Sequence, residues 1–468
     1  MKRYYLAIDI GASSGRHILG SFEDGKYILE EVYRFPNGAA RNGNHLCWDY
    51  CSLFENIVAG LAECKKLGKI PEVVGIDTWA LDYVLLDDSG TVIGDTVAYR
   101  DARTDGMDKF VSACVSDEEL YARAGIQKMA INTIYQLMAL KREHPEELSA
   151  AKTLIMVPDY MNYLLTGIMK SEYTNATTTA LVNAETKQWD DILLDKLGYP
   201  KEIFLPLSMP GTVVGNFTDE IAARVGYQAK VVLPATHDTG SAFLAVPARD
   251  DNAVYISSGT WSLMGVENME PVTSEESRSM NFTNEGGYDY RFRYLKNIMG
   301  LWIIQSIRHE LNDKYSFAEL EAQAREASDF PSVIAANDER FLAPRSMIEA
   351  IREYCRETSQ PVPESVGELI HCAYRSLALC YRDTILELEK ISGKKYTSIN
   401  IVGGGSKDSY LNQLTADRTG LPVFAGPSEG TALGNLMALM LSDGVFASLA
   451  EARAAIRPSF GIKEYLPR

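Results

Sequence analysis

The pattern of apolar and polar residues predicts a compact group of strands at the start of the chain. Residues 4–10 are apolar on both faces until Asp9, which is typical of a buried strand. Residues 17–22 form a second apolar run, and Asp24-Gly25 then gives a type I′ hairpin signal before the run at 26–35. The predicted order is therefore strand, glycine turn, strand, hairpin, strand. A Walker loop or a Rossmann fingerprint would need strand, turn, helix instead.

Helices and strands alternate along the rest of the chain. Apolar residues at helical spacing predict a helix over 50–67, and residues 73–86 are rich in strand formers, with a polar interruption at 77–82. Residues 117–245 alternate helical segments with loops and end in a predicted strand at 230–233. The second half predicts strands at 253–256 and 397–402 and helices at 364–391 and 411–418.

The length predicts two domains, because 468 residues suit two cores of roughly 200 residues each better than a single core. The boundary is predicted between residues 245 and 246, which gives an N-terminal domain over 1–245 and a C-terminal domain over 246–468. No low-complexity linker separates them, so we expect short hinges.

The net charge of −17 argues against a general binder of nucleic acid or of anionic membranes, although a local basic pocket for an anion stays open. No stretch approaches the roughly 20 apolar residues of a membrane helix. Asp9 interrupts the first apolar run, whereas the apolar core of a secretory signal is unbroken. A cytoplasmic protein is expected. The seven cysteines form no CxxC pair, which favours reduced thiols, although Cys355 and Cys372 could meet in space.

Two turns rich in glycine and hydroxyl residues follow predicted strands about half a chain apart. They are DIGASSGR at 9–16 and SSGTWS at 257–262. Backbone N–H groups and hydroxyls at a strand end suit the oxygens of a polyphosphate. Taken alone, the first turn is equally well a tight hairpin whose glycines supply positive φ. Asp9 could hold Mg²⁺ through water, or could be a buried carboxylate that only fixes its turn.

A third motif, His237-Asp238-Thr239, follows the predicted strand at 230–233. A kinase that acts on a neutral hydroxyl needs one carboxylate to accept or orient its proton, and Asp238 fits that role. Taken alone, the segment is better explained as a helix N-cap, and His237 as a packed neutral imidazole.

Three glycines at 403–405 follow the predicted strand at 397–402 and would let an adenine–ribose unit approach the backbone closely. The small residues at 426–435 either line the same pocket or allow close helix packing. Trp79 is predicted in a sugar pocket, whereas Arg100, Asp101 and Arg103 are either polar sugar contacts or a surface ion-pair cluster.

The order of these motifs across two halves matches the plan of actin-like ATPases, and the chain closely resembles the FGGY carbohydrate kinases from residue 4 to about 440. The motifs that carry the resemblance are DIGASSGR (9–16), GIDTW (75–79), AYRDART (98–104), EYTNATTT (172–179), HDT (237–239), SSGTWSLMG (257–265), TNEGG (283–287), KNIMGLW (296–302) and GGG (403–405).

The resemblance implies an α/β fold of two actin-like (ribonuclease-H-like) ATPase domains with an active-site cleft between them. It implies a phosphoryl transfer from ATP, with Mg²⁺, to the 1-hydroxyl of a ketose. L-rhamnulose is the expected substrate, with L-fuculose or xylulose as alternatives. A non-catalytic sensor on the same scaffold is disfavoured, because a pure binder needs no base. The expected partners are these small molecules, without nucleic acid or membrane, and the expected state is a monomer or weak homodimer.

The resemblance also assigns roles to single residues. Asp238 would be the general base, with a metal contact through water at Asp9. The nucleotide would be bound by Ala12, Ser13, Ser14, Gly15, Arg16, Thr260, Gln305 and Gly404, with Thr260 on the γ-phosphate. The sugar would be bound by Ala80, His237, Asp238, Thr239 and Asn297. Ala80 departs from the family, which has glycine there, and a backbone contact survives this change only where φ stays negative.

Overall fold

The computed structural model describes residues 2–342 and 344–468, which form two compact units. The first comprises the described residues up to Ala245 together with Glu267–Tyr294 and Thr431–Ser459. The second comprises Val246–Val266, Leu295–Gly430 and Phe460–Arg468. The chain thus passes from one unit to the other several times. The single boundary expected at 245/246 stays a prediction.

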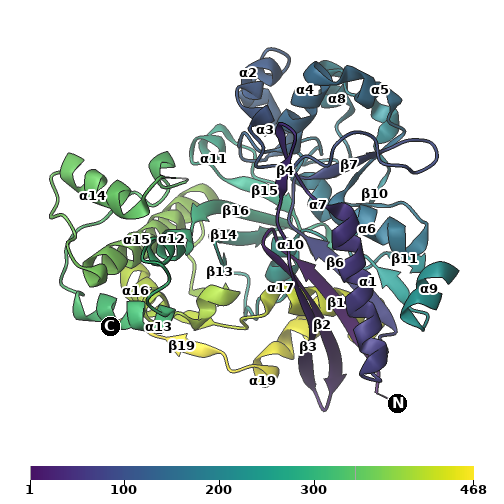
Figure 1. The fold of residues 1–468 in the computed structure, drawn as a ribbon. Helices are drawn as coiled ribbons and strands as arrows, with labels where there is room; N and C mark the ends of the chain where they lie inside the picture. Colours follow the sequence, from purple (N-terminus) through teal and green to yellow (C-terminus); the bar gives the residue numbers. More distant parts are fainter. Residues whose placement is uncertain (1, 343) are drawn as a thin grey trace. The chain divides into compact units, whose positions relative to one another are not determined.

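The first unit is built on a six-stranded sheet in the order β11-β12-β6-β1-β2-β3 (Figure 1). Its strands are β1 (Tyr5–Ile10), β2 (Ser14–Glu23), β3 (Lys26–Pro36), β6 (Val73–Thr78), β11 (Val213–Asn216) and β12 (Lys230–Val232). Every residue of β1 and of β6 is buried, as expected for strands covered on both faces. Asp24 and Gly25 both have positive φ, which confirms the predicted hairpin between β2 and β3.

Helices of the first unit bury apolar faces against this sheet. Helix α1 (Tyr50–Lys66) begins where Asp49 accepts a hydrogen bond from the N–H of Ser52, and its buried Ile57 and Leu61 belong to the core around β1 and β6. The other helices are α2 (Met107–Ser112), α3 (Asp117–Ala124), α4 (Thr133–Glu143), α5 (Pro145–Ala150), α6 (Val157–Thr166), α7 (Tyr173–Thr177), α8 (Asp191–Leu197), α9 (Asp219–Val225), α10 (Asp238–Leu244), α11 (Glu275–Ser279), α17 (Gly430–Ser442), α18 (Leu449–Ala454) and α19 (Ile456–Ser459).

Short strands complete the first unit. They are β4 (Ala40–Asn42), β5 (His45–Cys47), β7 (Tyr83–Leu86), β8 (Thr153–Met156), β9 (Ser171–Glu172), β10 (Leu207–Ser208) and β15 (Thr283–Gly286). Strands β7 and β8 pair antiparallel beside a second apolar cluster formed largely by α4 and α8. This cluster lies apart from the sheet that carries the predicted motifs.

The second unit contains most of a seven-stranded sheet with the order β15-β16-β14-β13-β17-β18-β19, of which β15 and the first residues of β16, up to Tyr294, belong to the first unit. Its strands are β13 (Ala253–Ser258), β14 (Trp261–Asn268), β16 (Phe292–Met299), β17 (Ser398–Val402), β18 (Val423–Ala425) and β19 (Lys463–Tyr465), and its helices are α12 (Trp302–Glu310), α13 (Phe317–Glu326), α14 (Met347–Glu357), α15 (Val366–Ser392) and α16 (Ser409–Thr419). Strand β13 pairs antiparallel with β14 and parallel with β17, as β1 does with β2 and β6. The two sheets therefore repeat one local topology.

The predicted elements in the second half are confirmed. Helix α15 begins at a capping box between Ser365 and Glu368 and ends at Gly393 with φ +67°. Cys355 on α14 and Cys372 on α15 are both buried free thiols. In the described part of the chain, no helix combines the length and apolarity that crossing a bilayer requires.

Candidate active site

The carboxyl ends of β1, β6 and β12 bring three predicted motifs to one edge of the first sheet. These strands run parallel, so the segments that follow them emerge side by side. The N–H of Thr78 donates to the carbonyl of Thr236 at 2.9 Å, and Thr78 pairs as a parallel bridge with His237. The N–H of Trp79 donates to the carbonyl of Ile10 at 3.2 Å. The glycine turn, Ala80 and Asp238 therefore lie at the same edge.

The first glycine turn is closed by an ion pair. Asp9 lies opposite Arg16 in the β1–β2 register, and the Nε and Nη2 groups of Arg16 donate to Asp9 Oδ2 at 2.9 and 2.7 Å. A Cβ on Gly15 would lie 2.1 Å from the Phe35 ring. Neither Gly11 nor Gly15 has positive φ, so the alternative in which these glycines supply positive φ is wrong. Gly15 is needed for packing.

Asp238 opens helix α10 but does not cap it. The N-cap position belongs to His237, which makes no side-chain cap bond, so the N-cap explanation of Asp238 is wrong. Asp238 Oδ1 accepts a hydrogen bond from the N–H of Thr239 at 2.6 Å, and 27% of its side chain is exposed. Burial raises the pKa of Asp238 to about 6, and the charge of Asp9 acts in the same direction. Such a carboxylate is mostly ionised at neutral pH yet basic enough to accept a proton.

A buried carboxylate holds the segment in front of Asp238. Glu172 is fully buried, and its Oε2 accepts hydrogen bonds from the N–H and the hydroxyl of Thr236 at 3.2 and 2.6 Å. Its Oε1 accepts from the N–H of Thr174 at the start of α7. Sequence reasoning used this residue only as part of a family motif and missed its structural role.

A buried arginine also reaches the Asp238 segment and was missed. Arg293 on β16 is 0% exposed and donates to the Thr239 hydroxyl and to the His237 ring. The Glu285 carboxylate lies 3.0 Å from its Nη2. No local pattern marks it, because Arg293 lies in an apolar strand and Thr239 and His237 are 54 and 56 residues away along the chain.

Trp79 is part of a packed indole pair. The Nε1 groups of Trp79 and Trp48 both donate to Asp82 Oδ2, at 2.9 and 2.6 Å, and the two ring centroids lie 4.1 Å apart. Trp79 is 6% exposed, so its ring belongs mainly to the core behind Ala80. Burial raises the pKa of Asp82 to about 6.

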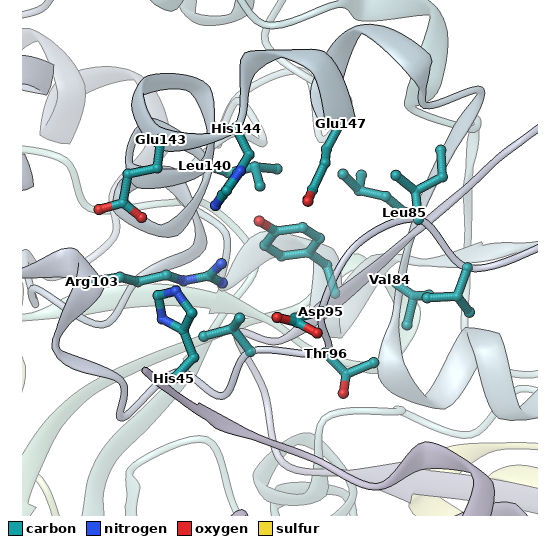
Figure 2. A pocket seen from close by; sticks show the side chains of 14 residues that line it. His45, Val84, Leu85, Asp95, Thr96, Arg103, Leu140, Glu143, His144 and Glu147 are labelled. Atoms are coloured by element: carbon teal, nitrogen blue, oxygen red, sulfur yellow. The ribbon is translucent and has the colours of Figure 1, made fainter. Parts of the chain in front are cut away.

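The cluster of Arg100, Asp101 and Arg103 divides into separate contacts. The carboxylate of Asp101 accepts from the N–H groups of Leu46 and Arg103 and so fixes the loop. Arg103 donates to Gln136 Oε1 at 3.1 Å and points into a cavity of about 110 Å³ (Figure 2). Acidic and imidazole side chains line this cavity as well: His45, Asp95, Glu143, His144 and Glu147.

The second unit brings two predicted nucleotide residues together. The carbonyl of Thr260 accepts from the N–H of Trp302 at 3.0 Å, which docks the β13–β14 turn on the start of α12. The Thr260 hydroxyl donates to Gln305 Oε1 at 3.4 Å. Thr260 itself is exposed. The structure places Asn297 on β16 of the same unit, partly buried.

The three glycines at 403–405 differ in their surroundings. A Cβ on Gly405 would lie 2.0 Å from Ser258 Oγ, and Gly403 has φ +85° and lies against the Ser258 carbonyl. A Cβ on Gly404 would meet nothing within 4 Å. Gly404 alone therefore presents open backbone to a ligand.

A cavity of about 260 Å³ begins next to these glycines, at Ser406 and Lys407. The segment 426–435 divides into two parts with different surroundings, and its place in a nucleotide pocket stays a prediction. Residues 426–429 line the cavity, whereas a Cβ on Gly434 would lie 1.7 Å from the Ser241 carbonyl of α10, as in close helix packing.

The carboxylates of the first sheet edge fit a hydrated metal better than a fully protein-ligated one. Within the described residues, no three His, Cys, Asp or Glu side chains cluster as a metal-binding set. Asp9 Oδ2 already accepts from Arg16, and Asp77 Oδ1 is buried without a hydrogen-bond partner. Mg²⁺ needs only one or two carboxylates when it keeps waters and binds phosphate oxygens, so these residues fit it.

Comparison with family models gives two matches that together cover most of the chain. Residues 4–245 match the N-terminal domain of the FGGY family of carbohydrate kinases, and residues 254–442 match its C-terminal domain. Among similar proteins, the rhamnulokinase of Oceanobacillus iheyensis is 47% identical over 465 residues, covering 99% of this chain and 98% of the relative. The rhamnulokinase of Halalkalibacterium halodurans is 48% identical over 463 residues, with 99% and 98% covered.

Solved structures show the same fold at low sequence identity. Gluconate kinase from Lactobacillus acidophilus has a TM-score of 0.83 at 17% identity, covering 100% of this chain and 94% of that one. Xylulose kinase from the same organism has a TM-score of 0.82 at 17% identity, with 100% and 94% covered. These likenesses confirm the two-domain α/β fold predicted from the sequence.

Proposed function

Because this chain belongs to the FGGY family of carbohydrate kinases, we propose that it transfers the γ-phosphoryl group of ATP to the 1-hydroxyl of L-rhamnulose. The observation that carries the proposal is Asp238, a partly exposed carboxylate with a raised pKa beside His237 and Thr239. The two relatives at 47% and 48% identity, both named rhamnulokinase, support the choice of ketose. L-fuculose and xylulose are the competing substrates.

Asp238 acts as the general base in this proposal. Its carboxylate accepts or orients the proton of the attacking hydroxyl, while Thr239 and His237 bind the sugar beside it. Transfer of a γ-phosphoryl group needs little further chemistry from the protein, because positioning and neutralisation of charge supply most of the rate. Asn297 is proposed as a further sugar contact.

Ala80 is compatible with a sugar contact through the backbone. The φ angle of Ala80 is not positive, and a backbone contact survives replacement of the family's glycine by alanine under that condition. The methyl group instead narrows the space beside the backbone, and we propose that its effect falls on ketose affinity rather than on turnover.

The nucleotide is assigned to residues of both units. Ala12, Ser13, Ser14, Gly15 and Arg16 are proposed to contact the phosphates, together with Thr260, Gln305 and Gly404. Asp9 is proposed to hold Mg²⁺ through water, and the ion would supply neutralisation of the phosphate charge. Arg16 would then contact phosphate oxygens in addition to, or in place of, Asp9.

A panel of ketoses with ATP and Mg²⁺ tests the proposal, with ADP release as the readout. We expect the highest kcat/KM with L-rhamnulose and product phosphorylated at the 1-hydroxyl. Equal or better turnover of L-fuculose or xylulose would overturn the choice of ketose while leaving the kinase class intact. ADP release that does not depend on any sugar would contradict a sugar kinase.

A further inference from the structure

Arg293 is the largest fully buried side chain in the described part of the chain, and it is charged. An arginine in this position needs strong compensation, because removing a guanidinium from water is costly. Part of that compensation comes from Glu285, whose carboxylate lies 3.0 Å from Arg293 Nη2. The Phe243 ring adds a cation–π contact at 5.8 Å. The remaining donors of Arg293 point elsewhere.

Arg293 directs its donors at the segment around Asp238. Nε donates to the carbonyl of Gly286 at 2.9 Å, Nη1 donates to Thr239 Oγ1 at 2.7 Å, and Nη2 donates to His237 Nδ1 at 3.0 Å. Glu285 Oε2 lies between the two cationic or polar groups, 3.0 Å from Arg293 Nη2 and 3.4 Å from His237 Nδ1. The guanidinium is therefore oriented by its hydrogen bonds to the segment that carries the proposed base.

The contact with His237 determines where the proton of the imidazole lies. A guanidinium can only donate, so the hydrogen bond from Arg293 Nη2 at 3.0 Å requires an Nδ1 without a proton. Glu285 Oε2 lies farther from the same nitrogen, at 3.4 Å, and would accept from it only if Nδ1 carried the proton. His237 is then neutral with its proton on Nε2. That nitrogen lies 3.0 Å from Thr239 Oγ1 and 3.5 Å from Asp238 Oδ1.

The same constraint determines how the Thr239 hydroxyl bonds. Its oxygen accepts from Arg293 Nη1, and His237 Nε2–H can only donate to it. A hydroxyl oxygen has two lone pairs, and both are then used. His237 Nδ1 also lies 3.3 Å from Thr239 Oγ1, but its single lone pair already accepts from Arg293. The hydroxyl proton is therefore left for an acceptor outside this cluster, such as a substrate oxygen.

We propose that Arg293 is a positioning residue that fixes the direction of hydrogen bonding beside the base, so that Thr239 donates to an acceptor oxygen of the ketose. This inference rests on the proposed function, in which Asp238 is the base and His237 and Thr239 bind the sugar. Arg293 acts through those two residues. It gives the site a preference for a ketose with an acceptor oxygen at this position.

The first test reads the tautomer of His237 directly in the full-length protein. Histidine is labelled with a heavy nitrogen isotope, and the His237 signals among the six histidines are assigned by their loss in His237→Gln. At neutral pH the ring should be neutral with its proton on Nε2. A proton on Nδ1, or a charged imidazolium, would overturn the proposal without the use of any variant of Arg293.

The second test compares two arginine-to-lysine variants at helix α10. Arg293→Lys keeps the positive charge but loses the planar guanidinium that donates to several acceptors at once. We expect kcat/KM for the ketose to fall about 100-fold, with KM for ATP unchanged. Arg453→Lys is the matched control. Arg453 bonds the carbonyls of Phe243 and Leu244 at the other end of α10 and pairs with Glu267. It should cost thermal stability alone, and equal kinetic effects in the two variants would contradict the proposal.

A double-mutant cycle separates positioning from general destabilisation. If Arg293 acts through Thr239, Arg293→Lys should cost less than about tenfold in the Thr239→Val background, against about 100-fold in the wild type. Full additivity would overturn the inference. If the wild-type enzyme phosphorylated no ketose, the proposed function would be overturned instead. The histidine spectrum would still test the tautomer of His237 independently of that result.

Discussion

Each unit has a strand hairpin that ends in a glycine- and hydroxyl-rich turn, and the two turns carry different chemistry. The β1–β2 turn includes an ion pair between Asp9 and Arg16, and its edge of the sheet also carries Asp238. The β13–β14 turn carries hydroxyls, with Thr260 bonded to Gln305. The local topology around both turns is nevertheless the same.

We expect this difference to divide the work between two hairpins of the same local topology. A charged edge can move protons and respond to metal ions and pH, because its groups titrate and pair. A turn of hydroxyls and backbone N–H groups binds phosphate oxygens without either sensitivity. Substitutions that change charge should therefore have the larger effect at the β1–β2 turn. At the β13–β14 turn, the larger effects should come from substitutions that change its shape or cover its backbone.

The largest effect is expected from Asp238→Asn. The amide keeps the size of the side chain but cannot accept the hydroxyl proton, so kcat should fall about 10³-fold. Binding of ATP, followed by calorimetry, should stay unchanged. Asp190→Asn is a matched control, because Asp190 caps α8 and pairs with Arg123 in the same unit. That variant should keep its turnover, and near-normal turnover of Asp238→Asn would exclude Asp238 as the base.

A smaller effect is expected from Asp9→Asn, which removes the carboxylate of the ion pair in the first turn. We expect kcat to fall about 100-fold, because Asp9 is proposed to hold the Mg²⁺ ion that would neutralise the phosphate charge. The Mg²⁺ concentration needed for half-maximal rate should rise. Measuring rate against Mg²⁺ concentration checks both expectations.

Thr260→Val is the counterpart in the second turn. Loss of one hydroxyl contact should cost about tenfold in kcat/KM for ATP, with the Mg²⁺ dependence unchanged. If Asp9→Asn left the Mg²⁺ dependence unchanged as well, the proposed division between a charged and an uncharged turn would be wrong.

The sequence predicts this edge well wherever the signal is local. Parallel strands with polar residues after each one place Asp238 and Ala80 at the same edge. The Asp9–Arg16 pair was not predicted, although its signal is local: the short turn sets the two residues opposite each other in the hairpin register.

The residues that the sequence missed are held by distant contacts. Arg293 meets Thr239 across 54 residues, and Asn435 meets Asp77 across 358. Hydrophobic periodicity reports which face of a strand is buried, but it does not identify the partner that faces a buried charge. Such pairs emerge only from the folded arrangement of strands β6 and β16 with their neighbours.

The pH dependence of the reaction tests whether the first edge works through charge. Burial raises the pKa of Asp238 to about 6, so the active, ionised form is present above that pH and is lost as pH falls through it. The kcat/KM for the ketose should fall about tenfold per pH unit below pH 6. A fall only near pH 4, the ordinary range of a carboxyl group, would contradict the raised pKa.

The smallest effect is expected at the second edge, from Gly404→Ala. The added methyl meets nothing in the protein, so stability should not change, and any rise in KM for ATP measures how closely a nucleotide approaches this backbone. Gly405→Ala provides the contrast, because its methyl would lie 2.0 Å from Ser258 Oγ and should cost about 1–3 kcal/mol of stability. A few-fold rise in KM for Gly404→Ala, with an unshifted thermal midpoint, would support binding through backbone access. An unchanged KM would remove Gly404 from the nucleotide site and leave the cavity beside Ser406 as the better candidate.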